Sequence, residues 1–440
     1  MSPSPLPRPA RQRGRSVRRA VPVAVLALAA AGLVPAVATP AEAAGPIGVT
    51  PSRTIPTTTF GGLAIASDGT IYAAVDDRID AWSPTSDGEV VVAKSFTDVA
   101  PSGPLALSPS AGLAYVDRDD AAVVVLDPGQ AGGAAVPTRS ISGPSTQLDD
   151  PGSLTWTPSG ALWVVDVAPD GSIELLRFAP GASGDVAPVR RVSGPRTRLT
   201  PGVAFPGGPS VAGLPSDGVA VSPPGLKPQY SVFTAGQSGN VAPQRIVKVS
   251  TPSPQWLAQG VAADPQGRVY LGSGDLGGDH FGRLDVFGPA ADGYAKPLVT
   301  LGDTQQRFQV PMFPTVAANG TLALVDASLL LIGGGGGGFD AEIQVFKPLL
   351  GKPGAPTSVS VTKSSSTATV AWKAASNPSG TPLTYRVVVA KGTKTLVSKT
   401  VSGRTLALKR SSLPSGTLKV TVSAVNVGGT SPGASKAFTR

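Results

Sequence analysis

Hydrophobic and polar positions alternate in short runs over residues 48–348, and the runs come in groups of three. In each group a small apolar run leads through a turn into a run rich in aromatic and β-branched residues. A third run then ends on an aromatic or apolar pair. Asp68-Gly69 and Asn319-Gly320 are two-residue hairpin signals between such runs. An alternation of period two, bounded by turn residues, predicts antiparallel β-strands rather than helices.

A recurring phrase follows most of these groups. In its fullest form it combines a small-residue turn with Val-Ala-Pro and an Arg-containing run, and the last copy is degraded. Its proline falls at Pro137, Pro188, Pro243 and Pro297, at intervals of 51, 55 and 54 residues. Three strands plus this fourth run, repeated at such intervals, are typical of the blades of a β-propeller. Residues 202–233 form the least regular unit, so the limits of the fourth blade are the least sharp.

The two ends of the repeat region complement each other. Residues 48–55 match the fourth-run phrase but precede the first group, and residues 314–346 form a group without a fourth run. We predict that the N-terminal run pairs with the last group, because unpaired strands would otherwise expose their edges. This pairing completes six blades.

Together these phrases resemble those of bacterial extracellular NHL-repeat propellers over residues 48–348. The resemblance implies a propeller that serves as a binding platform, a scaffold or, in some members, an enzyme. Streptogramin-lyase-like propellers rely on histidine, and the regucalcin and gluconolactonase group uses a metal-binding Glu/Asn/Asp set. Neither pattern maps onto this chain, whose propeller segment has only Glu89, Glu174 and Glu342 as glutamates.

The C-terminal segment, residues 357–440, also alternates with period two and follows a Pro- and Gly-containing linker at residues 350–356. Trp372 and Tyr385 stand where fibronectin type III domains carry a strand-B tryptophan and a strand-C tyrosine, so the segment resembles that family. The tyrosine that the family carries at the start of strand F is Leu418 here. We therefore predict a fibronectin type III β-sandwich that lacks the corner hydrogen bond.

The first 43 residues have the form of a cleavable export signal. A basic stretch with six arginines precedes an apolar run at residues 21–34, and Ala41-Glu42-Ala43 matches the cleavage pattern. We predict Sec-dependent export with cleavage after about Ala43, and the Arg18-Arg19 pair marks the alternative twin-arginine route. The predicted divisions are residues 1–43 for the signal peptide, 44–349 for the propeller, 350–356 for the linker and 357–440 for the fibronectin type III domain.

Composition and charge add two points. The chain has no cysteine, which excludes disulfides, thiolate metal sites and cysteine nucleophiles. Residues 44–353 carry 19 Lys and Arg against 27 Asp and Glu, whereas residues 354–440 carry 12 Lys and Arg and no acidic residue. The net charge of +9 therefore hides an acidic body joined to a basic module.

The basic module predicts contact with polyanions of the cell envelope, and the alternative is that its charge only keeps the domain soluble. Export and the low aromatic content argue against nucleic acid as the partner. The candidate polyanion-binding residues are Lys391, Lys394, Lys399, Arg404, Lys409 and Arg410.

Five aspartates near the ends of second strands mark a candidate ligand site. In the usual propeller geometry these ends lie near the channel, where a ring of carboxylates would bind Ca²⁺ or a cationic ligand. The alternative is that each aspartate accepts hydrogen bonds from its own turn. The five are Asp76, Asp117, Asp166, Asp275 and Asp326.

His280 is the only histidine, and it lies in a Gly-rich segment flanked by Asp275 and Asp279. It is the candidate general base or metal ligand. No second histidine or nucleophile accompanies it, so a plain surface position is the alternative and no catalytic residue is assigned. Trp256 follows a Pro- and Ser-containing stretch and is the tryptophan that we expect to be exposed.

These observations favour a secreted, monomeric, non-enzymatic binding, adhesion or scaffold protein without a membrane anchor. The propeller would bind a protein or polysaccharide of the cell envelope, and the basic domain would act as a spacer or attach to the envelope. We expect no cofactor, and Ca²⁺ is the one candidate ion. The alternative function is an extracellular hydrolase or lyase acting on a carbohydrate or lactone, with a metal at the channel mouth near His280.

Overall fold

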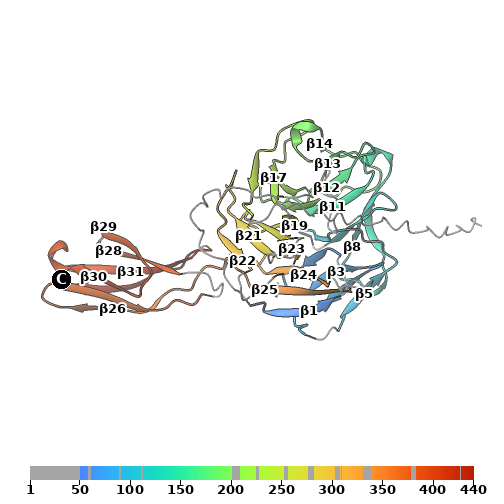
Figure 1. Cartoon of the computed structure of the whole chain (residues 1–440). Coiled ribbons are helices and arrows are strands. Elements are labelled where there is room, and N and C mark those ends of the chain that lie inside the picture. Colours follow the sequence, from blue (N-terminus) through green and yellow to red (C-terminus); the bar gives the residue numbers. More distant parts are fainter. Residues whose placement is uncertain are drawn as a thin grey trace, which may run out of the picture. The chain divides into compact units, whose positions relative to one another are not determined.

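The computed structural model describes most of the chain from residue 50 onward, and the regular secondary structure of the described part is almost entirely β-strand (Figure 1). Within it, no helix has the length and apolar character needed to cross a membrane. The described ranges are 50–57, 61–88, 91–110, 112–200, 209–223, 227–251, 256–275, 282–302, 308, 310–330, 338–377, 383–426 and 428–440.

Six sheets of antiparallel strands follow one another along the first part of this chain. The first sheet contains β2 (Leu63–Ile65), β3 (Ile71–Val75), β4 (Arg78–Trp82) and β5 (Lys94–Thr97), with β9 (Gly133–Ala134) added in parallel. The second contains β6 (Ala106–Leu107), β7 (Leu113–Asp117), β8 (Ala122–Leu126) and β10 (Pro137–Ile141). The third contains β11 (Pro151–Trp156), β12 (Leu162–Val167), β13 (Ile173–Phe178) and β14 (Arg190–Val192).

The remaining three sheets keep the same order of strands. The fourth contains β15 (Ser210–Gly213), β16 (Val219–Ser222), β17 (Gln229–Phe233) and β18 (Arg245–Lys248). The fifth contains β19 (Trp256–Ala263), β20 (Val269–Asp275), β21 (Arg283–Phe287) and β22 (Val299–Leu301). The sixth contains β23 (Pro311–Val316), β24 (Leu322–Leu330), β25 (Gly338–Phe346) and β1 (Arg53–Thr57).

The first strands of the six sheets contact one another in a closed cycle: β2 with β6, β6 with β11, β11 with β15, β15 with β19, β19 with β23, and β23 with β2. Figure 1 shows the sheets radiating from this centre. A ring of radial four-stranded sheets is the architecture of a β-propeller. The expectation of an all-β propeller is therefore confirmed at the level of the fold.

Strand β1 joins the two ends of the ring. It pairs antiparallel with β25, placing Ile55 opposite Ile343, and Ile55 is buried in the core of the sixth sheet. Arg53 also connects β1 to the first sheet, because its guanidinium donates to Ser83 O at 2.8 Å and to Gly69 O. The pairing predicted from the orphan N-terminal run is present.

The small-residue turn of the repeated phrase, which contains a glycine beside an Asp or Asn, connects neighbouring sheets. Gly184 N donates to Ser140 O at 2.6 Å on the outer strand of the second sheet, and its φ of +74° is accessible to glycine at little cost. Asp185 Oδ1 accepts from Ser145 N at 2.6 Å, at the start of the 3₁₀ helix η1 (Pro144–Thr146). The phrase is therefore a connection between sheets as well as a marker of the repeat.

The same pattern recurs at three further junctions. In each, a glycine N–H donates to a backbone carbonyl of the neighbouring outer strand, and the adjacent Asp or Asn accepts a backbone N–H from that strand or the turn that follows it. Gly239 N donates to Arg191 O, and Asn240 accepts from Arg196 N at the start of η2 (Pro195–Thr197). Gly293 N donates to Ile246 O, and Asp292 accepts from Ile246 N. Gly88 N donates to Thr54 O of β1, and Asp87 accepts from Thr54 N.

Large apolar side chains fill the spaces within and between the sheets. The aromatic residues predicted at the ends of third runs are all buried, and Trp163 is fully inaccessible. Burial of such side chains is the main favourable term in folding. The buried third-strand aromatics are Trp82, Phe178, Phe233, Phe287 and Phe346.

The C-terminal segment forms a β-sandwich with its own core, drawn from residues 359–438. One sheet contains β26 (Thr357–Lys363), β27 (Thr367–Lys373) and β30 (Thr405–Lys409), followed by η3 (Arg410–Ser412). The other contains β28 (Thr384–Lys391), β29 (Lys394–Val401), β31 (Thr417–Asn426), β32 (Gly429–Thr430) and β33 (Ala434–Thr439).

Two side chains hold the centre of the sandwich, one from each sheet. The rings of Trp372 and Tyr385 meet edge to face with centroids 5.4 Å apart. Leu418 is 1% exposed, so an apolar side chain packs into the core at the position where the resembling family carries tyrosine.

Candidate functional site

A cavity of about 1020 Å³ opens along the first strands of the ring. All six sheets contribute to it, each through its first strand and the turn that follows. Its lining is mainly apolar, with one large side chain or more from every sheet. These include Leu63, Leu107, Leu154, Val211, Val261 and Phe313.

The turns between first and second strands form the rim of this cavity. Four of them carry proline at the rim: Pro109, Pro158, Pro215 and Pro265. Because proline fixes its own φ and has no N–H, the rim is conformationally restricted and offers few backbone donors. Such a rim suits contact with an apolar or neutral surface better than capture of a small anion.

Two carboxylates stand among the described lining residues, and both are already hydrogen-bonded. Asp264 is 2% exposed and accepts from the Arg268 side chain, from the hydroxyl of Tyr270 at 3.2 Å and from two backbone N–H groups. Asp68 Oδ1 accepts Thr70 N at 2.8 Å within its turn. Burial in this cluster raises the pKa of the Tyr270 hydroxyl, and the charge of Asp264 adds to the shift.

Trp156 lines both the central cavity and a neighbouring cavity of about 680 Å³ between the second and third sheets. The guanidinium of Arg139 lies 5.1 Å from the centroid of its ring. The hydroxyls of Ser108, Ser110 and Thr138 belong to the same lining. This second cavity therefore combines an apolar floor with one cation, several neutral hydrogen-bonding groups and the carboxylate of Asp127, which accepts Gly129 N at 2.7 Å.

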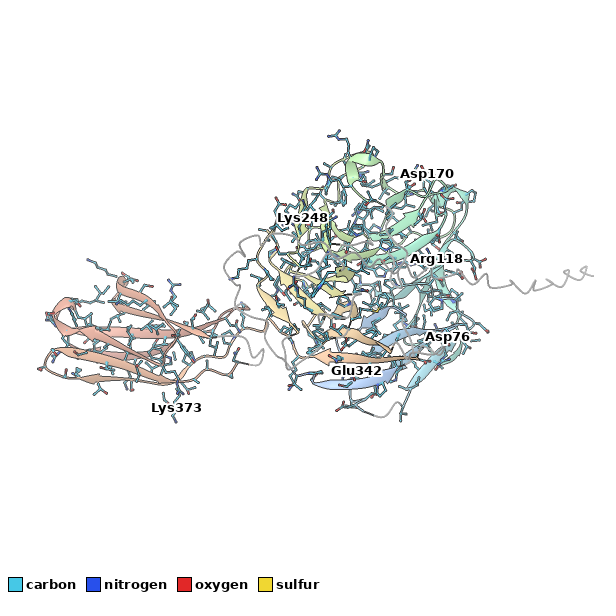
Figure 2. All side chains as sticks on the ribbon, in the orientation of Figure 1. Asp76, Arg118, Asp170, Lys248, Glu342 and Lys373 are labelled. Carbon is cyan, nitrogen blue, oxygen red and sulfur yellow. The ribbon has the colours of Figure 1, made fainter. Side chains whose placement is uncertain are left out.

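Asp76, Asp117, Asp166 and Asp326 are not among the described residues that line either cavity, and the side chain of Asp275 lies outside the described residues. The rim turns precede the second strands, whereas these aspartates lie toward the other end of the same strands or just beyond it. Figure 2 shows Asp76 at the outer surface of the first sheet. Within the described part of the chain, no three acidic or histidine residues lie close enough to hold a metal ion.

Two of the aspartates belong to local turns. Asp76 is exposed and adopts a φ of +50° immediately after β3. Asp117 Oδ1 accepts the backbone N–H of Asp120 at 3.2 Å in its own turn. Partial burial raises the pKa of Asp117, and the charges of Asp120 and Asp119 act in the same direction. The local hydrogen-bonding role is the one that this geometry favours.

Asp166 and Asp326 hold the segment that enters their own sheet. Asp166 Oδ1 accepts from Asp149 N and Asp150 N, each at 3.1 Å, and Asp326 Oδ1 accepts from Val310 N at 3.1 Å. These bonds position the chain just before β11 and β23. The structure thus ties the two carboxylates to separate sheets.

Asp166 also belongs to a buried cluster that the sequence pattern did not indicate. It is fully buried and lies opposite Glu174 in the register of β12 and β13, and Glu174 forms a bidentate ion pair with Arg191. Burial raises the pKa of Asp166 to about 7, with the charges of Asp149 and Glu174 adding to the effect. The Asp166 carboxyl therefore changes its charge near neutral pH.

Two third strands carry a buried aspartate paired with the arginine two residues before it. Arg78 Nε lies 3.0 Å from Asp80, and Arg283 Nε lies 2.8 Å from Asp285. A hydroxyl from the fourth strand, of Ser95 or Thr300, donates to the same carboxylate. These clusters link adjacent strands within a sheet and are structural.

Trp256 and His280 are the two remaining candidates from the sequence. Trp256 is 2% exposed, so the expectation of an exposed ring is wrong. It begins β19, and the guanidinium of Arg283 lies 4.9 Å from its centroid, so tertiary packing covers a residue that follows a polar stretch. His280 and the side chain of Asp275 lie outside the described residues, as does most of the Gly-rich segment after β24.

The six candidate cations of the sandwich fall into two groups. Lys391 and Lys394 are opposite each other in the β28–β29 hairpin. Lys409 ends β30 opposite Thr367, and Arg410 follows in η3. Lys399 and Arg404 form the second group and lie farther from these turns. Lys399 is opposite Val387 along β29, and Arg404 O accepts from Trp372 N.

No protein-family model matches the chain, and no curated protein matches it. Among solved structures, a gluconolactonase of Xanthomonas campestris is 17% identical with a TM-score of 0.41, covering 67% of this chain and 87% of its own. The calcium-binding protein regucalcin of Agrobacterium tumefaciens is 13% identical with a TM-score of 0.37, covering 67% and 92%. Domains d3–d4 of the rat CD45 extracellular region are 14% identical with a TM-score of 0.21, covering 22% of this chain and 55% of theirs.

Proposed function

We propose that this chain is a six-bladed, NHL-like β-propeller with a C-terminal fibronectin type III domain, secreted as a non-enzymatic binding protein of the cell envelope or extracellular space. The closed cycle of six first strands and the pairing of β1 with β25 support the number of blades. The two sheets that share a core around Trp372 support the second domain. The export signal carries the proposed localisation.

The central cavity is the observation that carries the proposed binding role. Six sheets build its apolar lining, and prolines restrict its rim. The described carboxylates in the lining are already hydrogen-bonded within their own turns or clusters. Such a site fits a neutral portion of an envelope polysaccharide or an apolar protein surface, because neither requires a free charge for recognition.

The second candidate function is an extracellular hydrolase or lyase with a metal at the channel mouth. One protein of similar fold is named a gluconolactonase, and another is named a calcium-binding protein. Against a shared metal site, Asp117, Asp166 and Asp326 are bonded within separate sheets. We therefore favour binding over metal-dependent hydrolysis.

Metal titration of thermal stability separates the two functions. A ligand that binds only the native state adds about 2.7 kcal/mol to the free energy of unfolding when its concentration is a hundred times its Kd. The melting temperature therefore rises. We expect millimolar Ca²⁺, Mg²⁺ or Zn²⁺ to leave the melting temperature of the chelator-treated mature protein unchanged. A rise with one of these ions that is abolished by His280→Ala or Asp275→Asn would contradict the proposal and favour the hydrolase.

A further inference from the structure

Seven of the twelve cations in residues 354–440 gather at one end of the sandwich, which we call the cationic end. The strand pairing brings them there, because this end holds the β26–β27 turn, the β28–β29 turn, η3 and the start of β31. The seven are Lys363, Lys391, Lys394, Lys409, Arg410, Lys419 and Arg440.

Hydrogen bonds between the loops fasten several of these side chains at the end. Lys391 Nζ donates to Ser415 O at 3.0 Å, joining the β28–β29 hairpin to the segment before β31. Arg410 Nη1 donates to Ser364 O at 2.7 Å, joining η3 to the β26–β27 turn. Lys363 Nζ reaches Thr439 O at 3.0 Å. The cations of four chain segments therefore share one surface.

These cations have no acidic side chain as a partner in their own domain. Residues 354–440 contain no Asp or Glu, and all the ion pairs found among the described residues belong to the ring of six sheets. Six of the seven are exposed, and Arg410 is half-buried. Like charges held together at a surface repel one another, so a bound polyanion would relieve this repulsion.

We propose that the cationic end is the place where the domain binds a linear polyanion. This inference rests on the proposed attachment to the envelope and assigns that attachment to one surface. Five of the seven cations are lysines, whose ammonium groups act as point charges and lack the planar fork of arginine. They would respond to the density of negative charge along a polymer, as phosphate or carboxylate groups supply, rather than to one shaped group.

The remaining cations supply a matched control set. Lys373 ends β27, Arg404 lies beside Trp372, and Arg386 lies opposite Ser423, so all three are outside the cationic end. Figure 2 labels Lys373 away from the end of the sandwich at which Figure 1 marks the C-terminus. A charge-only mechanism would make the two sets equivalent, whereas a localised site would not.

The experiment measures binding of the full mature chain to long-chain polyphosphate and to polyglutamate across a range of salt concentrations. One variant carries Lys391→Gln, Lys394→Gln and Lys419→Gln, and the control carries Lys373→Gln, Arg386→Gln and Arg404→Gln. Both remove three charges from exposed positions. A third variant, with arginine at the first three positions, retains the charge and should bind as the wild type does.

We expect the first variant to bind roughly tenfold more weakly at low salt. The slope of the logarithm of its binding constant against the logarithm of salt concentration should fall in magnitude by about 2, because binding through three fewer cations releases fewer counterions. The control should stay within about twofold of the wild type. If the protein binds only one of the two polymers, the charged group of that polymer, phosphate or carboxylate, is the group that the cationic end recognises. Either result would support the proposal.

If the two glutamine variants lost affinity for the polymers equally, the cationic end would not be the binding site, although the domain could still attach the protein to the envelope. Polymer binding that is unchanged when residues 354–440 are deleted would overturn the attachment role itself. A wild type that binds neither polymer at low salt would overturn the cationic end as a polyanion site. Thermal melting of each variant within about 2 °C of the wild type shows that the fold is retained.

Discussion

Asp166 shows how the fold changes the chemistry of a single residue. Its carboxyl is buried opposite Glu174, and its pKa rises to about 7, although an aspartate in an unfolded chain titrates near 3.9. Between these two values the folded state holds a proton that the unfolded state has released. The contribution of Asp166 to stability must therefore fall as pH rises from about 4 to about 7, and it should level off above that range.

Replacing Asp166 with asparagine should remove much of this fall. Asp166→Asn keeps an oxygen that can accept from Asp149 N and Asp150 N but cannot ionise. We expect the stability difference between pH 5 and pH 8, measured by urea denaturation, to shrink by on the order of 2–4 kcal/mol. The control is Asp170→Asn, at an exposed turn, which should leave the difference unchanged. If the free energy of unfolding of Asp166→Asn fell with pH as steeply as that of the wild type, the raised pKa of Asp166 would be contradicted.

At this scale the sequence identified the aspartates but not their surroundings. Strand ends are visible in the pattern, whereas the end of the sheet at which a cavity opens depends on how six sheets pack. Asp166 and Glu174 flank the β12–β13 turn, so counting outward from that hairpin could have paired them. Trp256 was misjudged because local composition does not report what tertiary packing covers.

At the scale of elements, the alternation of apolar and polar runs predicted the strands well. The orphan run before the first group became β1, paired with β25. The fourth strands of the third and fourth sheets begin at Arg190 and Arg245, later than the Val-Ala-Pro of the phrase. The small-residue turn before that phrase bonds to the neighbouring sheet, a long-range role that no local pattern reveals.

A designed disulfide tests the pairing of β1 with β25. Thr54 lies opposite Gln344, and the chain has no cysteine of its own, so Thr54→Cys with Gln344→Cys introduces the only two thiols. We expect the pair to oxidise in the folded protein and to stabilise it by about 2–4 kcal/mol, because the bond closes a long loop. The readouts are thiol counting and thermal melting with and without reductant.

An out-of-register pair provides the control for this disulfide. Thr54→Cys with Glu342→Cys should oxidise more slowly and stabilise less, because Glu342 lies opposite Pro56 instead. Free thiols persisting in the in-register protein under oxidising conditions would show that β1 does not complete the last sheet.

At the scale of the whole molecule, the chain joins an acidic ring with an apolar central cavity to a basic sandwich without carboxylates. The division of charge was visible in the sequence, because counting needs no fold. The concentration of cations at one end of the sandwich was not, because Lys363, Lys391 and Lys419 are far apart in the chain and meet only through strand pairing. The proposed function therefore rests on two surfaces that folding assembles.

The most direct measurement of the central claim is the retention of the mature protein on isolated cell walls at low and high salt. We expect the full chain to bind at low salt and to elute as salt rises, and a chain ending at residue 353 to bind much more weakly, because the 12 cations of the basic domain are lost. Equal retention of the two chains at low salt would contradict the account.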